Sequence, residues 1–135
     1  MDHLDASTLK PHPKVSAADV DPLVQALMDY TWGSELLPDE VKLTPAPRPL
    51  AELNFIKFKG CGSCHRTSEK FGGISGPELY TAWQRLRPDY LRSYIANPQA
   101  WDPVAPMPGY DLPPTEVGKL LEYLRLLGEE RRHDQ

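Results

Sequence analysis

Two cysteines and a histidine stand within five residues, in the run Cys61-Gly62-Ser63-Cys64-His65. The pattern Cys-x-x-Cys-His is the attachment signature of c-type haem. Residues three apart share one face of a helical turn, so both sulfurs can reach the two vinyl groups of one porphyrin. The adjacent His65 then falls beneath the iron, where its imidazole can serve as the proximal ligand. The spacing therefore predicts one covalently bound haem, attached through Cys61 and Cys64.

Other uses of two cysteines account for less of this pattern. A redox dithiol usually lies at a helix start within a βαβ unit, and nothing in this chain alternates as strands do. A structural zinc site needs four ligands, whereas this chain has two cysteines and scattered other histidines: His3, His12 and His133. A plain disulfide would leave His65 without a role. A dithiol, a zinc site and a disulfide remain the alternatives to haem.

Length and composition indicate a single domain with an appendage. The chain has 135 residues, with 15 prolines and 9 glycines, so long irregular segments are expected. Such a chain would struggle to close a large core alone, and a bound porphyrin would add apolar surface to it. No apolar run approaches the length of a transmembrane helix. The start of the chain, 1–10, is polar and lacks the hydrophobic stretch of a signal peptide. Since haem c is attached outside the bacterial cytoplasm, we expect a periplasmic or otherwise extracytoplasmic protein whose export signal has been removed.

The charge pattern gives no indication of nucleic-acid binding. The formal net charge is −4 and both signs are mixed along the chain. Basic residues cluster near the haem motif, at Lys57, Lys59, Arg66 and Lys70. They form either a solvated face or a positive rim that steers an acidic redox partner toward the haem edge.

Apolar residues recur at helical spacing in several segments, which predicts an all-α protein. An N-terminal helix is expected after Ser16, followed by a proline-rich extended loop over 32–49. Its apolar stripe is Val20, Leu23, Val24, Leu27 and Met28. A second helix is expected from Leu50 to His65, with Leu53, Ile56 and either Phe55 or Phe58 on its apolar side.

The C-terminal half is expected to hold three more helices. A glycine-rich loop over 72–76 leads into two short helices between Pro77 and Asn97, split before Pro88. Their inward residues are Leu86, Tyr90, Leu91, Tyr94 and Ile95. A proline-rich loop over 98–114 precedes a last helix from Thr115 to Gly128, where the glycine is a natural stop. The stripe of this helix is Val117, Leu120, Leu121, Leu124 and Leu127.

From about Leu50 to Gly128 the chain resembles class I cytochromes c, the small one-haem electron carriers. The matching elements, in the order of that family, are Cys61–His65, Gly76-Pro77-Glu78-Leu79, Tyr94-Ile95-Ala96-Asn97-Pro98, Met107-Pro108 and the closing helix with Tyr123-Leu124. The resemblance implies a cytochrome c fold around one haem. Residues 50–135 would form the cytochrome domain, and residues 1–49 would be an extension with one extra helix and a proline-rich arm.

The resemblance also implies roles for single residues. The backbone carbonyl of Pro77 would accept a hydrogen bond from His65 and make the ligand more basic. Met107 would be the distal ligand, presented from an extended loop because Pro106 and Pro108 bar a helix there. The competing distal ligands are His12, His133 and Met28, and Met107 can also be an ordinary core methionine.

Several polar and aromatic side chains are candidates to surround the haem. Trp83, Arg85 and Trp101 are candidates to bind the propionates, with plain packing as the alternative. Tyr94 or Asn97 is a candidate to donate a hydrogen bond to the sulfur of Met107.

Two features depart from the family pattern. The only glycine between Leu50 and Cys61 is Gly60, whereas family members usually have one where the first helix crosses the last. Residues 18–27 parallel 115–124, and residues 9–13 resemble a Met-Pro loop without its methionine, so the extension either copies the end of a cytochrome domain or aligns by chance. We expect the extra helix to pack on the core, and the single haem motif to bind one haem.

The expected function is one-electron transfer between a protein donor and a protein acceptor, because an iron with both axial positions filled has no site for a substrate. No catalytic triad, paired carboxylate site or phosphate loop appears elsewhere. Two alternatives stay open. In the first, the chain is a cytochrome subunit of a larger respiratory or dehydrogenase complex, docked through its N-terminal arm. In the second, it is a haem enzyme or gas sensor in which Met107 is displaced.

Overall fold

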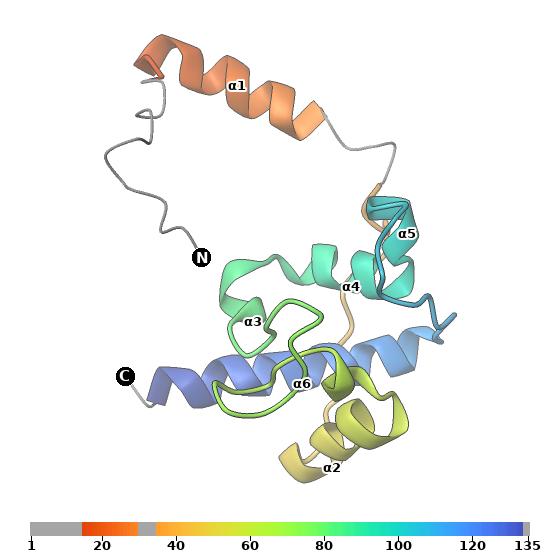
Figure 1. Ribbon diagram of the computed structural model, residues 1–135. Coiled ribbons are helices and arrows are strands. Elements are labelled where there is room, and N and C mark those ends of the chain that lie inside the picture. The colour runs from red at the N-terminus through yellow and green to blue at the C-terminus, as the bar shows by residue number, and fades with distance from the viewer. Residues whose placement is uncertain (1–14, 30–34, 134–135) are drawn as a thin grey trace, which may run out of the picture. The chain divides into compact units, whose positions relative to one another are not determined.

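The computed structural model describes residues 15–29 and 35–133, and the contact pattern divides the chain into two units, 1–31 and 32–135. Every regular element in the described residues is helical, which confirms the all-α prediction (Figure 1). The elements are α1 (Ala17–Asp29), α2 (Arg48–Leu53), a π-helical turn η2 (Asn54–Phe58), a 3-10 turn η3 (Cys61–Ser63), α3 (Ala82–Arg85), α4 (Pro88–Ala96), α5 (Pro98–Trp101) and α6 (Pro114–His133). None of these helices is both long and apolar enough to cross a membrane.

The first unit contributes α1, the N-terminal helix that the apolar spacing predicts. Its start is marked by Ser16, whose hydroxyl donates to the Asp19 carboxylate at 2.5 Å. Pro22 lies inside the helix. The apolar residues Val20, Leu23, Val24 and Leu27 are all exposed. Residues 1–14, with His12 and the 9–13 segment, and the side chain of Met28 lie outside the described part of the chain.

Prolines begin most helices of the second unit. Pro88, Pro98 and Pro114 are the first residues of α4, α5 and α6, and Pro49 lies in the first turn of α2. Proline suits this position because the first backbone N–H of a helix has no partner within the helix and the ring fixes φ near the helical value. The many prolines of the chain are therefore compatible with a largely helical unit. One of them starts α5 inside the segment 98–114 that we expected to be a loop without helix, so that expectation is wrong.

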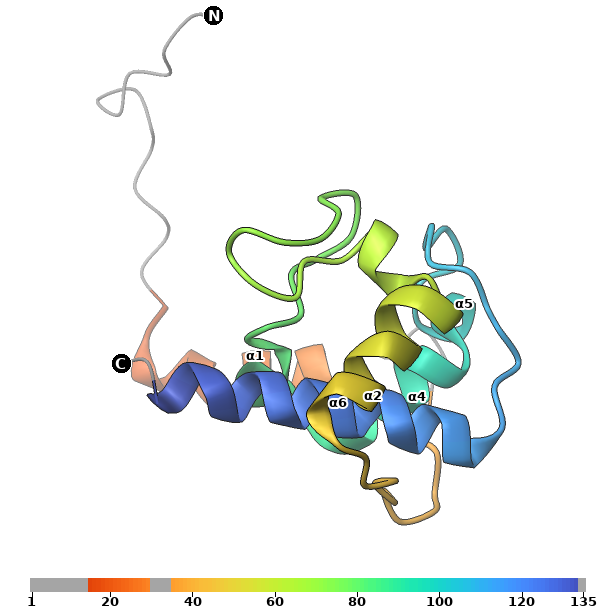
Figure 2. The same ribbon diagram turned by 90° about the horizontal axis from the view of Figure 1, so that it is seen from below.

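The last helix is the centre of the core. It runs through the second unit with α2 on one side and with α3 and α4 on the other (Figures 1 and 2). All five residues of its predicted stripe are buried, and the fully enclosed Tyr123 joins them. The rest of the buried apolar cluster is Ala51, Phe55, Ala82 and Leu91. Of the five residues expected to face inward from 77–97, only Leu91 is fully buried and the others are half-buried.

The predicted stop of this helix at Gly128 is wrong, because α6 continues to His133. Gly128 instead allows a close contact: a Cβ at this position would lie 3.1 Å from the Cβ of Trp83. The Gln84 amide donates to the Gly128 carbonyl at 2.8 Å across the same contact. A glycine inside a helix costs only about 1 kcal/mol relative to alanine, so packing outweighs propensity here.

The predicted continuous helix from Leu50 to His65 is also wrong. It breaks at Gly60, which has a left-handed φ of 70°, after the π-helical turn η2. Its buried side chains are Ala51 and Phe55, and the Phe55 ring lies 4.8 Å from that of Tyr123. Of the two phenylalanines expected as alternatives on the apolar side, Phe55 is buried and Phe58 is exposed. Leu53, also expected on that side, is exposed because it is two residues away from both Ala51 and Phe55 and so lies on the opposite face. Ala51 is a small residue that lies in the same buried apolar cluster as the side chains of α6.

The segment expected as a proline-rich extended loop over 32–49 is bound to the second unit. The Leu37 N–H donates to the Ser93 hydroxyl at 2.9 Å, and Arg92 donates to backbone carbonyls of the same segment. Further along, the Thr44 N–H donates to the Gly118 carbonyl at 3.2 Å. A Cβ on Gly118 would lie 2.6 Å from the Lys42 carbonyl oxygen, so the contact requires glycine. Residues 36–47 therefore belong to the same unit as α4 and α6.

Candidate functional site

The Cys-x-x-Cys-His residues form one short turn. The Cys64 N–H donates to the Cys61 carbonyl at 3.2 Å and the His65 N–H donates to the same carbonyl at 3.0 Å. Both cysteines are free thiols, with Cys61 half-buried and Cys64 exposed. The turn starts directly after the left-handed Gly60, which separates it from η2. The two sulfurs and the imidazole are thus carried by a single turn, as the spacing predicts.

The glycine-rich loop lies against the backbone of this turn. Two backbone hydrogen bonds join them, from Gly73 N to Gly62 O at 2.9 Å and from Gly76 N to Cys64 O at 2.8 Å. A third joins the residues that follow each of them, from Leu79 N to Arg66 O at 2.9 Å. A Cβ on Gly73 would lie 1.9 Å from the Ser63 carbonyl oxygen, and one on Gly72 would lie 2.3 Å from that of His65. Side chains at these positions are sterically excluded. Backbone contacts therefore fix the loop on the turn.

His65 is buried and has two close neighbours in the loop. Its Nδ1 lies 2.7 Å from the carbonyl oxygen of Pro77, which is the hydrogen bond that the family resemblance implies. A Cβ on Gly76 would lie 2.6 Å from Cε1 of the ring and 2.7 Å from Nδ1. With its proton on Nδ1, the ring donates to Pro77 and keeps the Nε2 lone pair for a metal. The loop thus fixes both the orientation and the tautomer of His65.

A polar cluster holds the chain directly after Pro77. The Glu78 carboxylate accepts hydrogen bonds from the backbone N–H of Thr81 at 3.1 Å, from its hydroxyl, and from Arg85 at 2.8 Å. Burial raises the pKa of the Glu78 carboxyl, but the bonds from Thr81 and the charge of Arg85 outweigh burial and lower it below its usual 4.5. Arg85, a candidate for a propionate, is paired here with Glu78. Thr81 was not among the residues expected at the site, and Glu78 was expected only as part of the Gly76-Pro77-Glu78-Leu79 element, without a role of its own.

Burial also raises the pKa of the Cys61 thiol, against smaller opposing effects that include the charge of Lys59. Reactive redox dithiols have lowered thiol pKa values at the N-terminus of a helix, and η3 is a 3-10 turn of three residues. The environment of Cys61 is therefore unlike that of a redox dithiol. Among the basic residues near the motif, Lys59 is paired with Glu116 at 3.0 Å.

Met107 lies half-buried in the segment after α5, which has no regular structure from 102 to 113. Its carbonyl oxygen accepts a hydrogen bond from the side-chain amide of Gln99 at 2.7 Å, and the carbonyl of Ala105 accepts from the same nitrogen at 3.2 Å. Gln99 was not among the residues expected at the site, and no spacing rule relates it to Met107. Asn97, a candidate donor to the Met107 sulfur, accepts from the Ala100 N–H and caps α5.

The aromatic candidates separate into two places. Trp101 packs edge-on against Tyr90 with ring centroids 4.9 Å apart, and Tyr94 lies 5.8 Å from the same ring. Burial raises the pKa of Tyr90. Trp83 instead packs on α6 at Gly128. Figure 2 shows the glycine-rich loop and the segment after α5 on the same side of α6.

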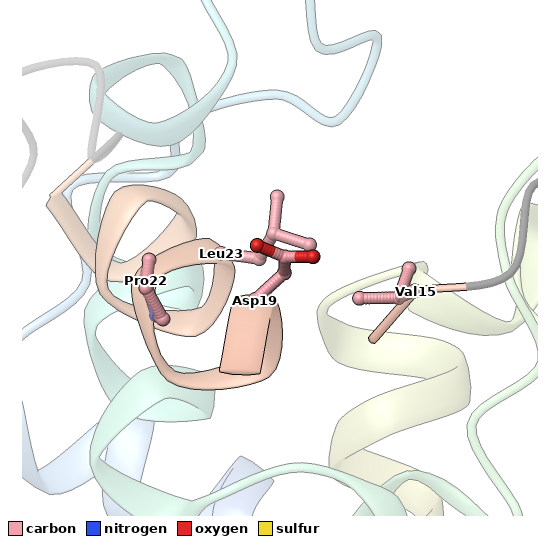
Figure 3. A pocket seen from close by; sticks show the side chains of 4 residues that line it. All are labelled: Val15, Asp19, Pro22 and Leu23. Carbon is pink, nitrogen blue, oxygen red and sulfur yellow. The ribbon is translucent and has the colours of Figure 1, made fainter. Parts of the chain in front are cut away.

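The first unit has a surface feature of its own. An open hollow on the first unit is lined by Val15, Asp19, Pro22 and Leu23 (Figure 3). Within 15–29 and 35–133 no three His, Cys, Asp or Glu side chains gather in a way that would hold a metal ion. The side chain of His133 is not described. Comparisons with protein-family models, with curated proteins and with solved structures found no match.

Proposed function

We propose that the protein is a one-electron carrier with one haem c, attached through Cys61 and Cys64 and ligated by His65 and Met107. The single observation that carries the proposal is the environment of His65. The ring is buried, bonded to Pro77 through Nδ1 and backed by Gly76, and it shares one turn with two free thiols. This arrangement leaves Nε2 as the nitrogen available to an iron.

The residues present fit a covalent haem. Two thiols and one imidazole on a single turn match the two vinyl carbons and the iron of one porphyrin, as the motif requires. When bound, the haem would supply a one-electron couple at an iron held by histidine and a thioether. His65 orients its ring through Pro77, and the bond to the carbonyl makes the imidazole more electron-donating. The all-α architecture and the long closing helix support a cytochrome c fold for 50–135.

Met107 is the proposed distal ligand. It stands between Pro106 and Pro108 in an irregular segment, which places it outside any helix. A thioether favours ferrous iron and raises the reduction potential relative to a second histidine. Trp83, Tyr94, Asn97 and Trp101 remain proposed residues of the haem surroundings. The proposed location is the periplasm or another compartment outside the cytoplasm, where the haem would be attached, and the proposed partners are a redox protein donor and acceptor.

The proposal is tested by expressing the chain with an export signal in a host that matures cytochromes c. We expect one covalently bound haem per chain by pyridine haemochrome, a low-spin ferric spectrum and the weak sulfur-to-iron band in the red. Met107→Leu should lose that band, and Met28→Leu, the matched control on α1, should keep it. Protein without covalent haem, or with two haems, would refute the proposal, and a high-spin ferric spectrum would favour the haem enzyme or gas sensor.

One observation favours the second function, a cytochrome subunit of a larger complex. The described apolar side chains of α1, which are Val20, Leu23, Val24 and Leu27, are all exposed, and the exposed fraction of Leu27 is 72%. Exposed apolar faces of this kind mark protein interaction sites. A docking role predicts that replacing Leu23 and Leu27 with glutamine removes the protein from a complex in extracts of its own cells. A free carrier would elute identically with and without the replacements.

A further inference from the structure

We propose that Gln99 is the positioning residue of the Met107 segment, acting through hydrogen bonds to the chain that presents the distal ligand. This inference rests on the proposed function, because it assigns Gln99 a purpose only where Met107 binds iron. Its basis is the pair of bonds from Gln99 Nε2 to the carbonyls of Met107 at 2.7 Å and of Ala105 at 3.2 Å. One amide group thus holds the residues on both sides of Pro106.

The segment needs an external restraint because it has few internal ones. Pro106 and Pro108 have no N–H, and among the described residues no backbone N–H of 106–112 donates to a backbone carbonyl. The internal bonds lie earlier, from Ala105 N to Asp102 O at 2.9 Å and from Val104 N to the Asp102 carboxylate at 3.0 Å. Gln99 therefore supplies the hydrogen bonds that fix the backbone at Met107.

Gln99 is itself carried by a fixed element. It is the second residue of α5, whose first residue, Pro98, is completely buried and whose start is capped by Asn97. On the other side of the amide, a Cβ on Gly109 would lie 3.4 Å from the Gln99 side-chain oxygen. The segment therefore contacts the amide at Ala105 and at Met107, and an added side chain at Gly109 would reach the amide oxygen. A small helix anchored in the core thus sets the position of the segment.

The consequence concerns exchange of the distal ligand. A thioether is a weak iron ligand, so its occupancy depends on how firmly the protein holds it in place. Without the Gln99 bonds, the backbone at Met107 gains freedom and the sulfur competes less well with an added ligand. Gln99 does not touch the iron in this proposal, and its effect reaches the iron only through Met107.

The test is imidazole binding to the ferric holoprotein of Gln99→Leu and Gln99→Glu. Losing the amide bonds is worth about one neutral hydrogen bond, so we expect imidazole to bind about tenfold more tightly to Gln99→Leu, with a weaker sulfur-to-iron band. Gln99→Glu should show a larger change because its carboxylate would face two carbonyl oxygens. Gln99→Arg, which keeps N–H donors at similar length, should stay close to wild type.

Gln84→Leu is the matched control, since Gln84 also donates its side-chain amide to a distant carbonyl, that of Gly128 at 2.8 Å. It should leave imidazole affinity and the sulfur band unchanged. If Gln99→Leu does not fold, the remaining two variants test the same point, because Gln99→Glu should bind imidazole more tightly than Gln99→Arg. A wild-type sulfur band with unchanged affinity in all Gln99 variants would refute this inference alone. A wild-type protein that lacks the band would refute the Met107 assignment, and with it this inference.

Discussion

The contact between Gly76 and the His65 ring gives a sharp prediction for Gly76→Ala. The added methyl carbon would lie 2.6 Å from Cε1 and 2.7 Å from Nδ1. Carbon atoms in good contact are about 3.5–4.0 Å apart, so the ring and the loop must separate by about 1 Å. Residues on both sides of Gly76 are tied to the turn by backbone bonds, which limits any movement of the loop.

The expected cost has two parts. Forcing one extra carbon into a packed site costs about 1–3 kcal/mol. Moving the ring also breaks or lengthens the 2.7 Å bond between His65 Nδ1 and Pro77 O, whose loss costs about 1 kcal/mol. The sum is a loss of about 2–4 kcal/mol in the free energy of unfolding, a large share of the roughly 5–15 kcal/mol by which an ordinary domain is stable.

The assay is denaturant unfolding of wild type and Gly76→Ala, together with NMR of the His65 Nδ1 proton. The variant should unfold at lower denaturant concentration, and its Nδ1 proton should exchange faster with water. Gly109→Ala is the control, because its Cβ would meet only the Gln99 oxygen at 3.4 Å, and its stability should stay within about 0.5 kcal/mol. Equal stability and equal proton exchange in wild type and Gly76→Ala would refute the contact on which the site is built.

Three further predictions concern the support of the site. Gly118→Ala gains helix propensity but places its Cβ 2.6 Å from the Lys42 carbonyl oxygen, so we expect a net loss of stability of about 1–3 kcal/mol and faster proteolysis within 36–47. Unchanged proteolysis would contradict the binding of that segment to α6. Because the folded-state pKa of Glu78 is lowered, its carboxylate contributes stability above its ordinary pKa of 4.5 that is lost as the pH falls through the folded value. Unfolding of wild type and Glu78→Gln should therefore differ at neutral pH and converge in acid, and a constant difference at all pH values would count against the ionised cluster. Phe55→Ala, at a buried position against Tyr123, should cost about 3–5 kcal/mol, while Phe58→Ala, 69% exposed in the same turn, should change thermal unfolding little; similar losses would contradict the observed face.

Helices with a regular apolar stripe were the part of the fold that the sequence predicted well. The stripe of the last helix has a period of 3.6 residues, and all five of its residues are buried in α6. The stop at Gly128 failed because local rules treat a glycine near a helix end as a cap, whereas here it accommodates Trp83 from α3. The break at Gly60 and the π-helical turn before it have no periodic signal in the sequence.

In the candidate site, too, local features were predicted and contacts between separate segments were not. The spacing of Cys61, Cys64 and His65 is local, and one turn brings these residues together as expected. The bond from His65 to Pro77 was implied by family resemblance and has no periodicity behind it. The bonds from Gln99 and the contact of Gly118 with Lys42 depend on where separate segments meet in the folded chain, which neither spacing nor propensity encodes.

The two proposed ligands are held by different means, and this difference bears on function. His65 is fixed by backbone hydrogen bonds to the glycine-rich loop and by contacts that only glycine permits, so few side-chain changes outside the glycines can release it. The backbone at Met107 instead accepts a hydrogen bond from a single side chain, the amide of Gln99. In the proposed carrier the distal ligand is therefore the one that a few mutations can release. A change at position 99 would let small added ligands compete better with the Met107 sulfur for the iron of the proposed carrier, while the His65 side stays intact.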